Sequence, residues 1–345
     1  MKARSLIGIL ALVALALLLW SLRWVLLVLF GAVVLAVALD VPTTLLRRAL
    51  PLNRSAALLV VVVLLLGIGG WLSLLLLPEL VEQVQELVLL LPVLLQGLVD
   101  LAARLPILNA LGRDLMDGAL WERLQPLGGQ LIGVAGGAAN STIQLLLMAL
   151  LAVLMALDPR SHQRLLLAAT PSFYRQRMRQ LLADCRSALG GWLAGMTLSA
   201  ITVFLLTWAG LAILNVPLAL LCALVCGLLT FVPTVGPTAA TLLPLGLAVL
   251  VSPAKVVQVL ILRLVLQNGE AFLLTPLLLS RTVNLLPTVA LMAQLSLGAL
   301  LGLPGLLLAL PLVVVLQVIG SEVLVRDVMD RWTGSDLQAP VVTPE

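Results

Sequence analysis

Residues 56–77 read AALLVVVVLLLGIGGWLSLLLL, a run of 22 positions without a charged side chain. As an α-helix this run would be about 33 Å long, because each residue adds about 1.5 Å, and the hydrocarbon core of a bilayer is about 30 Å thick. The whole chain of 345 residues is 62% hydrophobic and 10% charged, whereas about a quarter of the residues of a soluble domain are charged. The sequence therefore predicts an all-α, polytopic membrane protein.

Further apolar segments of similar length lie on both sides of this run. We predict about eight hydrophobic segments in total, two of which are helical hairpins broken by Gly and Pro. They are Leu6 to Leu22, Trp24 to Leu39, Ala56 to Leu77, Ser141 to Leu157, Trp192 to Leu214, Val216 to Val232, Val256 to Leu279 and Leu285 to Gly320. Lys2 and Arg4 precede the first segment as in a secretory signal, but the second segment follows directly after Arg23, so we interpret the pair as a retained membrane hairpin.

Basic residues gather in three segments at the ends of these spans. They are Lys2 and Arg4, then Arg47, Arg48 and Arg54, then Arg160, Arg164, Arg175, Arg177, Arg179 and Arg186. Because cytoplasmic loops carry an excess of Lys and Arg, all three segments and both termini are predicted to be cytoplasmic. Residues 78–140 carry seven acidic and three basic side chains. This segment is predicted to be external and to begin with an amphipathic helix, since Leu80, Val84 and Leu87 recur at helical spacing.

Gly and Pro first interrupt the apolar pattern in FVPTVGPT, residues 231–238. The arms on either side, Val216 to Val232 and Ala239 to Val251, would be about 25 and 20 Å long as helices, which is shorter than the roughly 30 Å that a span requires. A re-entrant hairpin therefore fits this unit better than two full spans.

A second break follows the same plan at LGLPG, residues 301–305, between the apolar arms 286–300 and 306–320. Pro311 lies in the second arm here, as Pro244 does in the first unit. Paired Gly/Pro-interrupted segments indicate the midplane site of a transporter. Two alternatives stay open, four full spans and kinked packing helices, because the loop charges fit each of them.

Between the two units, the predicted span Val256 to Leu279 carries polar residues on one helix face. Arg263, Gln267 and Glu270 follow i, i+4, i+7 spacing. A carboxylate at the centre of a transmembrane helix costs roughly 2.5 to 3.5 kcal/mol, so Glu270 is expected to face a cavity or a partner, or to be protonated. We favour a functional face over a structural hydrogen bond between helices. Arg263 has the simpler alternative of reaching toward the lipid headgroups.

These features give a provisional organisation of the chain. It comprises 1–77 with three N-terminal spans, 78–140 as the external segment, 141–191 with a fourth span and basic cytosolic helices, 192–320 as a core with two broken units, and 321–345 as a cytosolic tail. The candidate substrate- or ion-binding residues are Pro233, Thr234, Gly236, Pro237, Gln267, Asn268, Glu270, Thr275, Pro276, Gly302, Pro304 and Gly305.

The sequence contains no Walker loop and no HExxH, GxSxG or CxxC motif, and its three cysteines form no ligand pattern. We therefore predict that the protein has no catalytic residue, metal site or cofactor and that it is not an enzyme. The basic residues lack interleaved aromatics, so nucleic acid is not an expected partner. The expected partners are membrane lipids and a small-molecule or ion substrate.

The same motifs resemble those of the autoinducer-2 exporter family of bacterial inner-membrane permeases, over nearly the whole chain. Phe231, Pro233, Gly236 and Pro237 look like its Ile-Pro-x-x-Gly-Pro signature; Gln267, Asn268, Glu270, Thr275 and Pro276 look like its Gln-Gln-x-Glu...Thr-Pro helix; Pro287, residues 302–305 and Pro311 are similar to its closing segment. Ala271 and Phe272 depart from the usual Gly-Asn, and Gly195-Met196 from the usual Gly-Gln.

The resemblance implies a homo-oligomer, such as a pentamer, and a secondary transporter that exports a small polar metabolite across the inner membrane. Members of the family are described as exporters of the quorum-sensing furanone and others as cation-proton antiporters. Both kinds of cargo therefore stay open.

Overall fold

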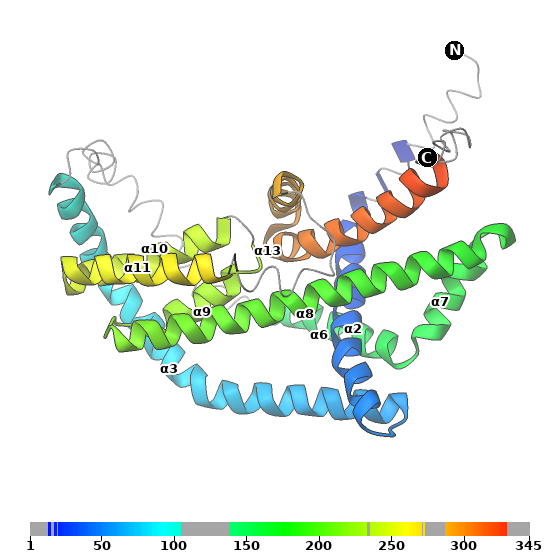
Figure 1. Cartoon of the computed structure of the whole chain (residues 1–345), viewed down its shortest axis with the longest axis horizontal. Helices are drawn as coiled ribbons and strands as arrows, with labels where there is room; N and C mark the ends of the chain where they lie inside the picture. The colour runs from blue at the N-terminus through cyan, green and yellow to red at the C-terminus, as the bar shows by residue number, and fades with distance from the viewer. Residues whose placement is uncertain are drawn as a thin grey trace, which may run out of the picture.

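The computed structural model describes residues 20–104, 138–232, 235–270 and 287–329, together with residues 13, 14, 17, 18 and 272. Every regular element in these ranges is helical, as predicted (Figure 1). Four described helices are long and apolar enough to cross a membrane, or five if the bent pair Ile143–Leu157 and Pro159–Ala168 is one span. The chain is therefore an all-α, polytopic membrane protein. Most of the predicted first segment, Leu6 to Leu22, lies outside the described residues.

The described elements follow one another without any strand. They are α2 (Arg23–Ala49), α3 (Arg54–Arg104), α6 (Ala138–Leu157), α7 (Pro159–Ala168), the 3-10 turn η2 (Ser172–Tyr174), α8 (Arg175–Ile213), α9 (Ala219–Leu229), α10 (Val235–Val251), α11 (Pro253–Gly269), α13 (Pro287–Ile319) and the π-helical η4 (Gly320–Met329). The helices that qualify singly as spans are Arg23–Ala49, Arg54–Leu90, Ser172–Ile213 and Pro304–Leu324. The arms of the predicted broken units are shorter apolar helices, Ala219–Leu229, Gly236–Val251 and Thr288–Gly302.

Several helices continue past the ends that hydropathy predicted. α2 does not end at Leu39 but runs on to Ala49, because Asp40 is buried in an ion-paired position rather than exposed at a helix end. α8 joins the basic segment and the next span in one helix of 39 residues. α3 continues from the apolar run into the predicted amphipathic helix without a break. A charged residue in the sequence therefore marks the edge of an apolar run better than the end of a helix.

Proline and a capping side chain set the start of two helices. Asp158 accepts hydrogen bonds from the backbone N–H of Ser161 at 3.2 Å and from its hydroxyl at 2.5 Å, and Pro159 occupies the first turn of α7. These bonds from Ser161 lower the pKa of the exposed Asp158 carboxyl. The chain bends by 87° between α6 and α7, where Asp158 precedes Pro159. Ser252 caps α11 in the same way by accepting from the N–H of Lys255 at 3.3 Å.

α8 is the central element of the molecule and crosses its whole length (Figure 1). Its first part lies beside α7, its middle packs against α2 and α13, and its last part packs against α9 and α11. The outer part of α3 covers α9 and α10, where Leu80 and Leu87 pack on the core. Gln83 of α3 also accepts the backbone N–H of Leu221 at 2.8 Å, which satisfies a donor at the start of α9 that no cap residue serves.

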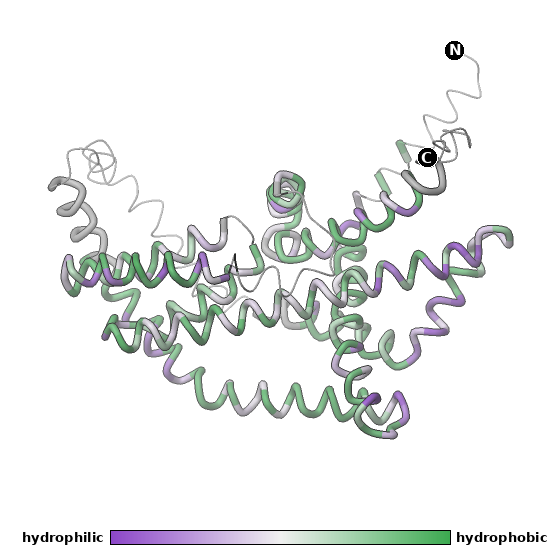
Figure 2. The backbone as a smooth tube through the Cα atoms, in the orientation of Figure 1, coloured by the Kyte–Doolittle hydropathy of each residue, from purple (hydrophilic) through white to green (hydrophobic). Residues whose placement is uncertain are grey.

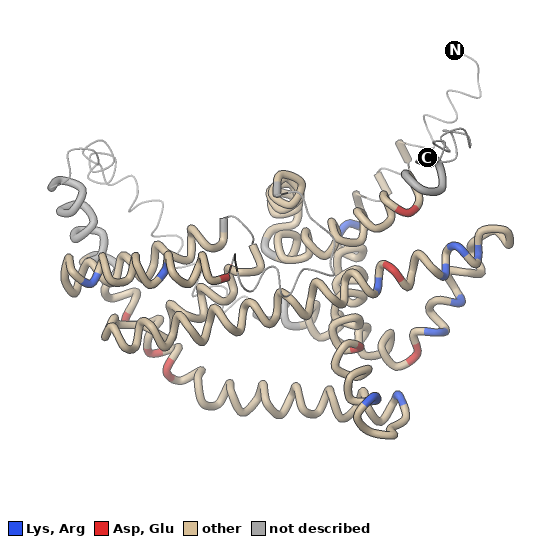
Figure 3. Tube along the Cα trace, in the orientation of Figure 1, with Lys and Arg blue, Asp and Glu red and all other residues tan. Residues whose placement is uncertain are grey.

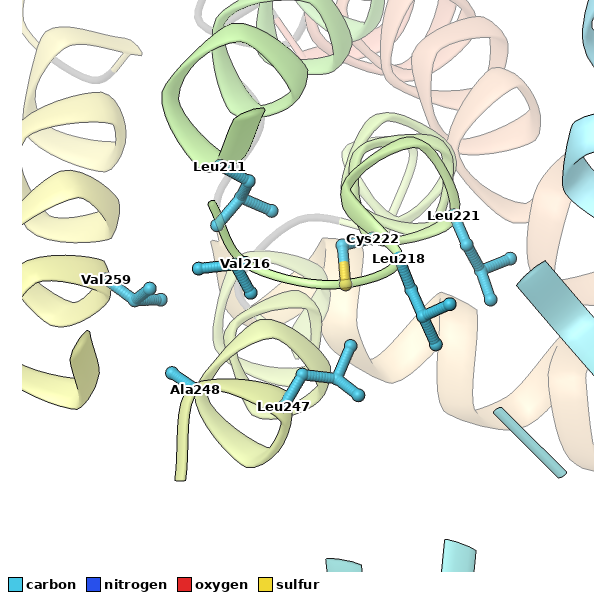
Figure 4. Close-up of a cluster of buried hydrophobic side chains, with 8 residues drawn as sticks. All are labelled: Leu211, Val216, Leu218, Leu221, Cys222, Leu247, Ala248 and Val259. Carbon is cyan, nitrogen blue, oxygen red and sulfur yellow. The ribbon is translucent and has the colours of Figure 1, made fainter. Parts of the chain in front are cut away.

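Two buried clusters hold these helices together. The first lies where α9, α10 and α11 meet the end of α8 and includes Leu211, Cys222, Leu247 and Val259 (Figure 4). The second joins α2, α8 and α13; its members are Val34, Leu189, Trp192, Ala290, Leu310 and Val314. The two clusters therefore give the middle and the last part of α8 separate sets of partners.

Much of the apolar surface is exposed in the single chain. On α3, Trp71 is 65% exposed and Leu74 is 81% exposed. Figure 2 shows that most of the length of this outer helix consists of hydrophobic residues. Charges are concentrated at the α2–α3 loop, in α7 and at the start of α8 (Figure 3). This separation of apolar helix bodies from basic ends is the distribution that a lipid solvent requires.

Candidate functional site

The first Gly/Pro break closes one helical arm against the next. α9 ends at Leu229, α10 begins at Val235, and the two helices pack on each other. The N–H of Gly236 donates to the carbonyl of Val232 at 2.7 Å, and a Cβ on Gly236 would overlap the carbonyl oxygen of Leu229. Glycine is therefore required here by the close approach of the two backbone segments. The predicted site residues Pro233 and Thr234 lie outside the described residues.

The second break uses glycine in the same way. Gly302 interrupts α13 with φ 64° and ψ −150°, a conformation that L side chains rarely adopt. A Cβ on Gly305 would overlap the carbonyl oxygen of Leu297, so the arm after the break again closes on the arm before it. Both predicted interruptions are thus real breaks in helical structure.

Arg263 lies on α11 and points into the protein. Its side chain is 4% exposed, and it donates from Nε to the hydroxyl of Thr241 at 3.2 Å, from Nη1 to the hydroxyl of Thr207 at 3.4 Å and from Nη2 to the carbonyl of Pro237 at 3.3 Å. The guanidinium therefore does not reach toward the headgroups. It joins α11 to α8 and to the first turn of α10, directly after the first break.

Glu270 follows the last residue of α11, in a wider π-type turn. The regular α-helix ends at Gly269, and most of the second half of the predicted span Val256 to Leu279 lies outside the described residues, so the predicted central position of Glu270 stays a prediction. Turns of the π type are frequent at functional sites. The Ser199 hydroxyl of α8 donates to Glu270 Oε1 at 2.5 Å. The carboxylate thus has the partner from a neighbouring helix that its position in an apolar segment requires.

A small cavity lies between these two charged groups. Its lining residues come from α8, α9, α10 and α11 and the break: Val203, Cys226, Thr230, Pro237, Arg263, Leu266, Gln267 and Glu270. Its volume is about 10 Å³, room for about one water molecule. The structure therefore brings together Pro237, Gln267 and Glu270 of the predicted site and adds Arg263 to them. A cation, a carboxylate and hydroxyl groups can together hold a polar solute or an ion.

Other predicted site residues lie elsewhere. Asn268 is exposed and donates to the carbonyl of Leu264 on its own helix at 2.7 Å. Gly302, Pro304 and Gly305 belong to α13, which packs on α8, α2 and η4, whereas α11 packs on α10 and α8. Thr275 and Pro276 lie outside the described residues. The joint site that we predicted from both breaks therefore stays a prediction.

The sequence also contained a signal that we missed, on α8. Gly195, Ser199, Val203, Thr207 and Leu211 are all buried and recur every four residues, which places them on one face of the helix. Ser199 holds Glu270 and Thr207 holds Arg263. A stripe of small and hydroxyl residues on a long apolar helix is typical of close helix packing with polar contacts.

One further buried polar group has no role in this cluster. Gln294, on the first arm of α13, is 2% exposed, and neither its side-chain oxygen nor its nitrogen has a hydrogen-bond partner within the described ranges. Burying an unpaired amide is costly. Among the same residues, no group of three His, Cys, Asp or Glu side chains comes together to hold a metal ion.

Long apolar helices, two glycine-dependent breaks and a buried polar cluster beside one of them define a multi-pass membrane transporter. A comparison with protein families agrees: the chain belongs to the AI-2E family of transporters, whose model matches residues 9–324.

Individual relatives are also described as transport proteins. "Putative transport protein YrrI" of Bacillus subtilis (strain 168) is 29% identical over 149 residues, 43% of this chain and 42% of that protein. "Putative transport protein YueF" of the same strain is 24% identical over 193 residues, 56% of this chain and 52% of that protein. "Putative transport protein MT0215" of Mycobacterium tuberculosis (strain CDC 1551 / Oshkosh) is 33% identical over 146 residues, 42% of this chain and 40% of that protein. The matched stretches thus span about half or less of each relative.

Proposed function

We propose that this protein is a secondary transporter that exports a small polar metabolite, such as autoinducer-2, across the bacterial inner membrane, and that its site lies at the Arg263–Glu270 cluster. The observation that supports this most is the presence of both charges at one cavity among apolar helices. Ionisable residues at such positions are costly and mark substrate or ion pathways. The cluster also lies beside the first break, and broken helices form the sites of many transporters.

The proposed site comprises Pro237, Gln267, Arg263 and Glu270, with Ser199 as the positioning residue of the carboxylate. Pro233, Thr234, Gly236, Asn268, Thr275 and Pro276 are proposed to border it, and Gly302, Pro304 and Gly305 are proposed to join it in another conformation. In the present conformation the cavity has room for about one water molecule. A metabolite therefore needs α9 and α10 to separate from α11, and the re-entrant hairpin that these arms are proposed to form is the element that moves.

A cation-proton antiporter is the second candidate. The small cavity is the observation that favours it, because a proton or a dehydrated ion fits without rearrangement. In that case Glu270 carries the ion, and its Ser199 hydrogen bond is exchanged for the ion during the cycle.

Transport by purified protein in lipid vesicles tests both candidates. We expect counterflow of one labelled polar metabolite from a panel, and a loss of at least tenfold in Arg263→Gln and in Glu270→Gln. Glu79→Gln is the matched control, because Glu79 is exposed on α3 outside the cluster. Movement of protons against sodium or potassium, with no metabolite exchanged, would replace the exporter by the antiporter. Full metabolite transport in both cluster variants would refute the proposed site.

A further inference from the structure

A second polar cluster involves the first half of α8, away from the proposed transport site. Asp40 of α2 is 7% exposed, and it pairs with Arg54 of α3 at 2.6 Å and with Arg186 of α8. Arg54 also donates twice to the carbonyl of Ala156, at 3.1 and 2.9 Å. The cluster therefore joins α2 and α8 to the start of α3 and the end of α6.

The charges of this cluster do not balance. Two guanidinium groups face one carboxylate, which leaves one positive charge in excess. The Ala156 carbonyl at the C-terminal end of α6 carries partial negative charge, but it serves Arg54. Within the described residues Arg186 donates a single hydrogen bond, from Nη2 to Asp40, although a guanidinium has five N–H donors. Arg186 therefore carries the unmatched charge and most of the unused donors.

A cavity of about 170 Å³ opens beside Arg186. Most of its lining is apolar and includes Val37 and Leu182, and its polar lining residues are Asp40, Arg54, His162, Gln163 and Arg186. His162 has its Nδ1 at 2.8 Å from the carbonyl oxygen of Asp158, which leaves Nε2 uncommitted by that bond. A ligand of this cavity must therefore combine an anionic group with an apolar part.

We propose that this cavity binds the phosphate of an anionic membrane phospholipid, with Arg186 as the main ligand and His162 beside it. The residues that line the cavity come from α2, α3, α6, α7 and α8, and the basic residues of α7 and of the start of α8 gather in this part of the molecule (Figure 3). Lipid headgroups are expected where apolar helix bodies meet such basic ends. Basic pockets between transmembrane helices bind such headgroups, and guanidinium groups bind phosphate through paired hydrogen bonds. The apolar walls favour a lipid over a free phosphate ion, because the acyl-glycerol part covers them.

Lipid-dependent melting of the purified protein in detergent tests this site. Phosphatidylglycerol should raise the Tm of the wild type in a saturable manner, whereas phosphatidylcholine and inorganic phosphate should not. Arg186→Gln should raise the half-saturating phosphatidylglycerol concentration about tenfold, as expected for a lost charge-assisted hydrogen bond. Arg179→Gln is the matched control, since Arg179 is an exposed arginine on the same helix that does not line the cavity.

The remaining outcomes decide the proposal. Equal protection by inorganic phosphate would overturn the lipid assignment, and equal weakening in Arg179→Gln would reduce the effect to surface charge and overturn the site. If Arg186→Gln does not fold, His162→Gln is measured instead, because His162 takes part in none of the ion pairs. That variant must then weaken binding of phosphatidylglycerol, and wild-type affinity in it would overturn the proposal.

Discussion

Arg263 and Glu270 lie seven residues apart in the sequence and have different hydrogen-bond partners in the structure. The spacing on α11 predicts that they share a helix face, and both do line one cavity. The direction of Arg263 could not be predicted, because its acceptors Thr207, Thr241 and Pro237 belong to other helices. The sequence of one helix shows which of its faces is polar, but it does not show which acceptor atoms of other helices lie opposite that face.

Because the hydrogen-bond acceptors of Arg263 are all neutral, the structure makes a specific prediction for Arg263→Met. Removing the guanidinium also removes the cost of burying a charge, and the carbonyl of Pro237 still accepts the hydroxyl of Thr241 at 2.8 Å. The free energy of unfolding should therefore change by only about 1 kcal/mol, while transport falls at least tenfold. Detergent melting and vesicle transport measure the two effects. A large loss of stability with normal transport in the surviving protein would make Arg263 structural.

At the scale of helices, the breaks could be located from Gly and Pro alone, but their construction could not. Gly236 and Gly305 each approach a carbonyl oxygen of the preceding arm, a contact that depends on the fold and not on local propensity. Helix ends were less predictable. α2 and α8 run past charged residues because partners on other helices neutralise or solvate those charges.

Gly236→Ala should be strongly destabilising for this reason. The added Cβ overlaps the carbonyl of Leu229, so the backbone of the break must shift, and we expect a loss of about 1 to 3 kcal/mol in the free energy of unfolding. Gly69→Ala on α3 is the control, since no atom lies within 4 Å of its Cβ position. That change should be neutral or stabilising by up to about 1 kcal/mol. Equal effects of the two variants on melting would show that the break is not closely packed.

The unpaired amide of Gln294 leads to the opposite expectation for stability. Gln294→Leu removes two polar atoms that have no partner within the described ranges, so the free energy of unfolding should rise by about 1 to 3 kcal/mol. If the first arm of α13 takes part in transport, activity should fall in the same variant. Gln258→Leu, at an exposed position of α11, controls for the change in apolar surface. A destabilised Gln294→Leu protein would mean that the amide is satisfied in the membrane.

At the scale of the whole molecule, ion pairs join segments that are far apart in the sequence. Arg54 and Arg186 come from two of the basic segments that the charge pattern assigned to the same side, and both contact Asp40. Arg177 pairs with Glu322 of η4 at 2.8 Å. These ion pairs join α2, the start of α3, α8 and the segment after α13, as is expected if these segments share one side of the membrane.

These ion pairs leave one question about orientation for experiment, namely which side of the membrane the joined segments face. Because the excess of Lys and Arg is cytoplasmic in most membrane proteins, we expect the shared side of Arg54, Arg177 and Arg186 to face the cytoplasm and residues 105–137 to face outward. A reporter that is active only in the cytosol should be active when fused after residue 172 and inactive when fused at Gly112. A reporter active only outside should give the reverse pattern at both positions. Activity of the cytosolic reporter at Gly112 alone would invert the protein in the membrane, and with it the leaflet of the proposed lipid cavity. The helix α6 lies between the two fusion positions and is one arm of the bent pair that can cross the membrane. Activity of the cytosolic reporter at both positions would show that the chain does not cross the membrane between them.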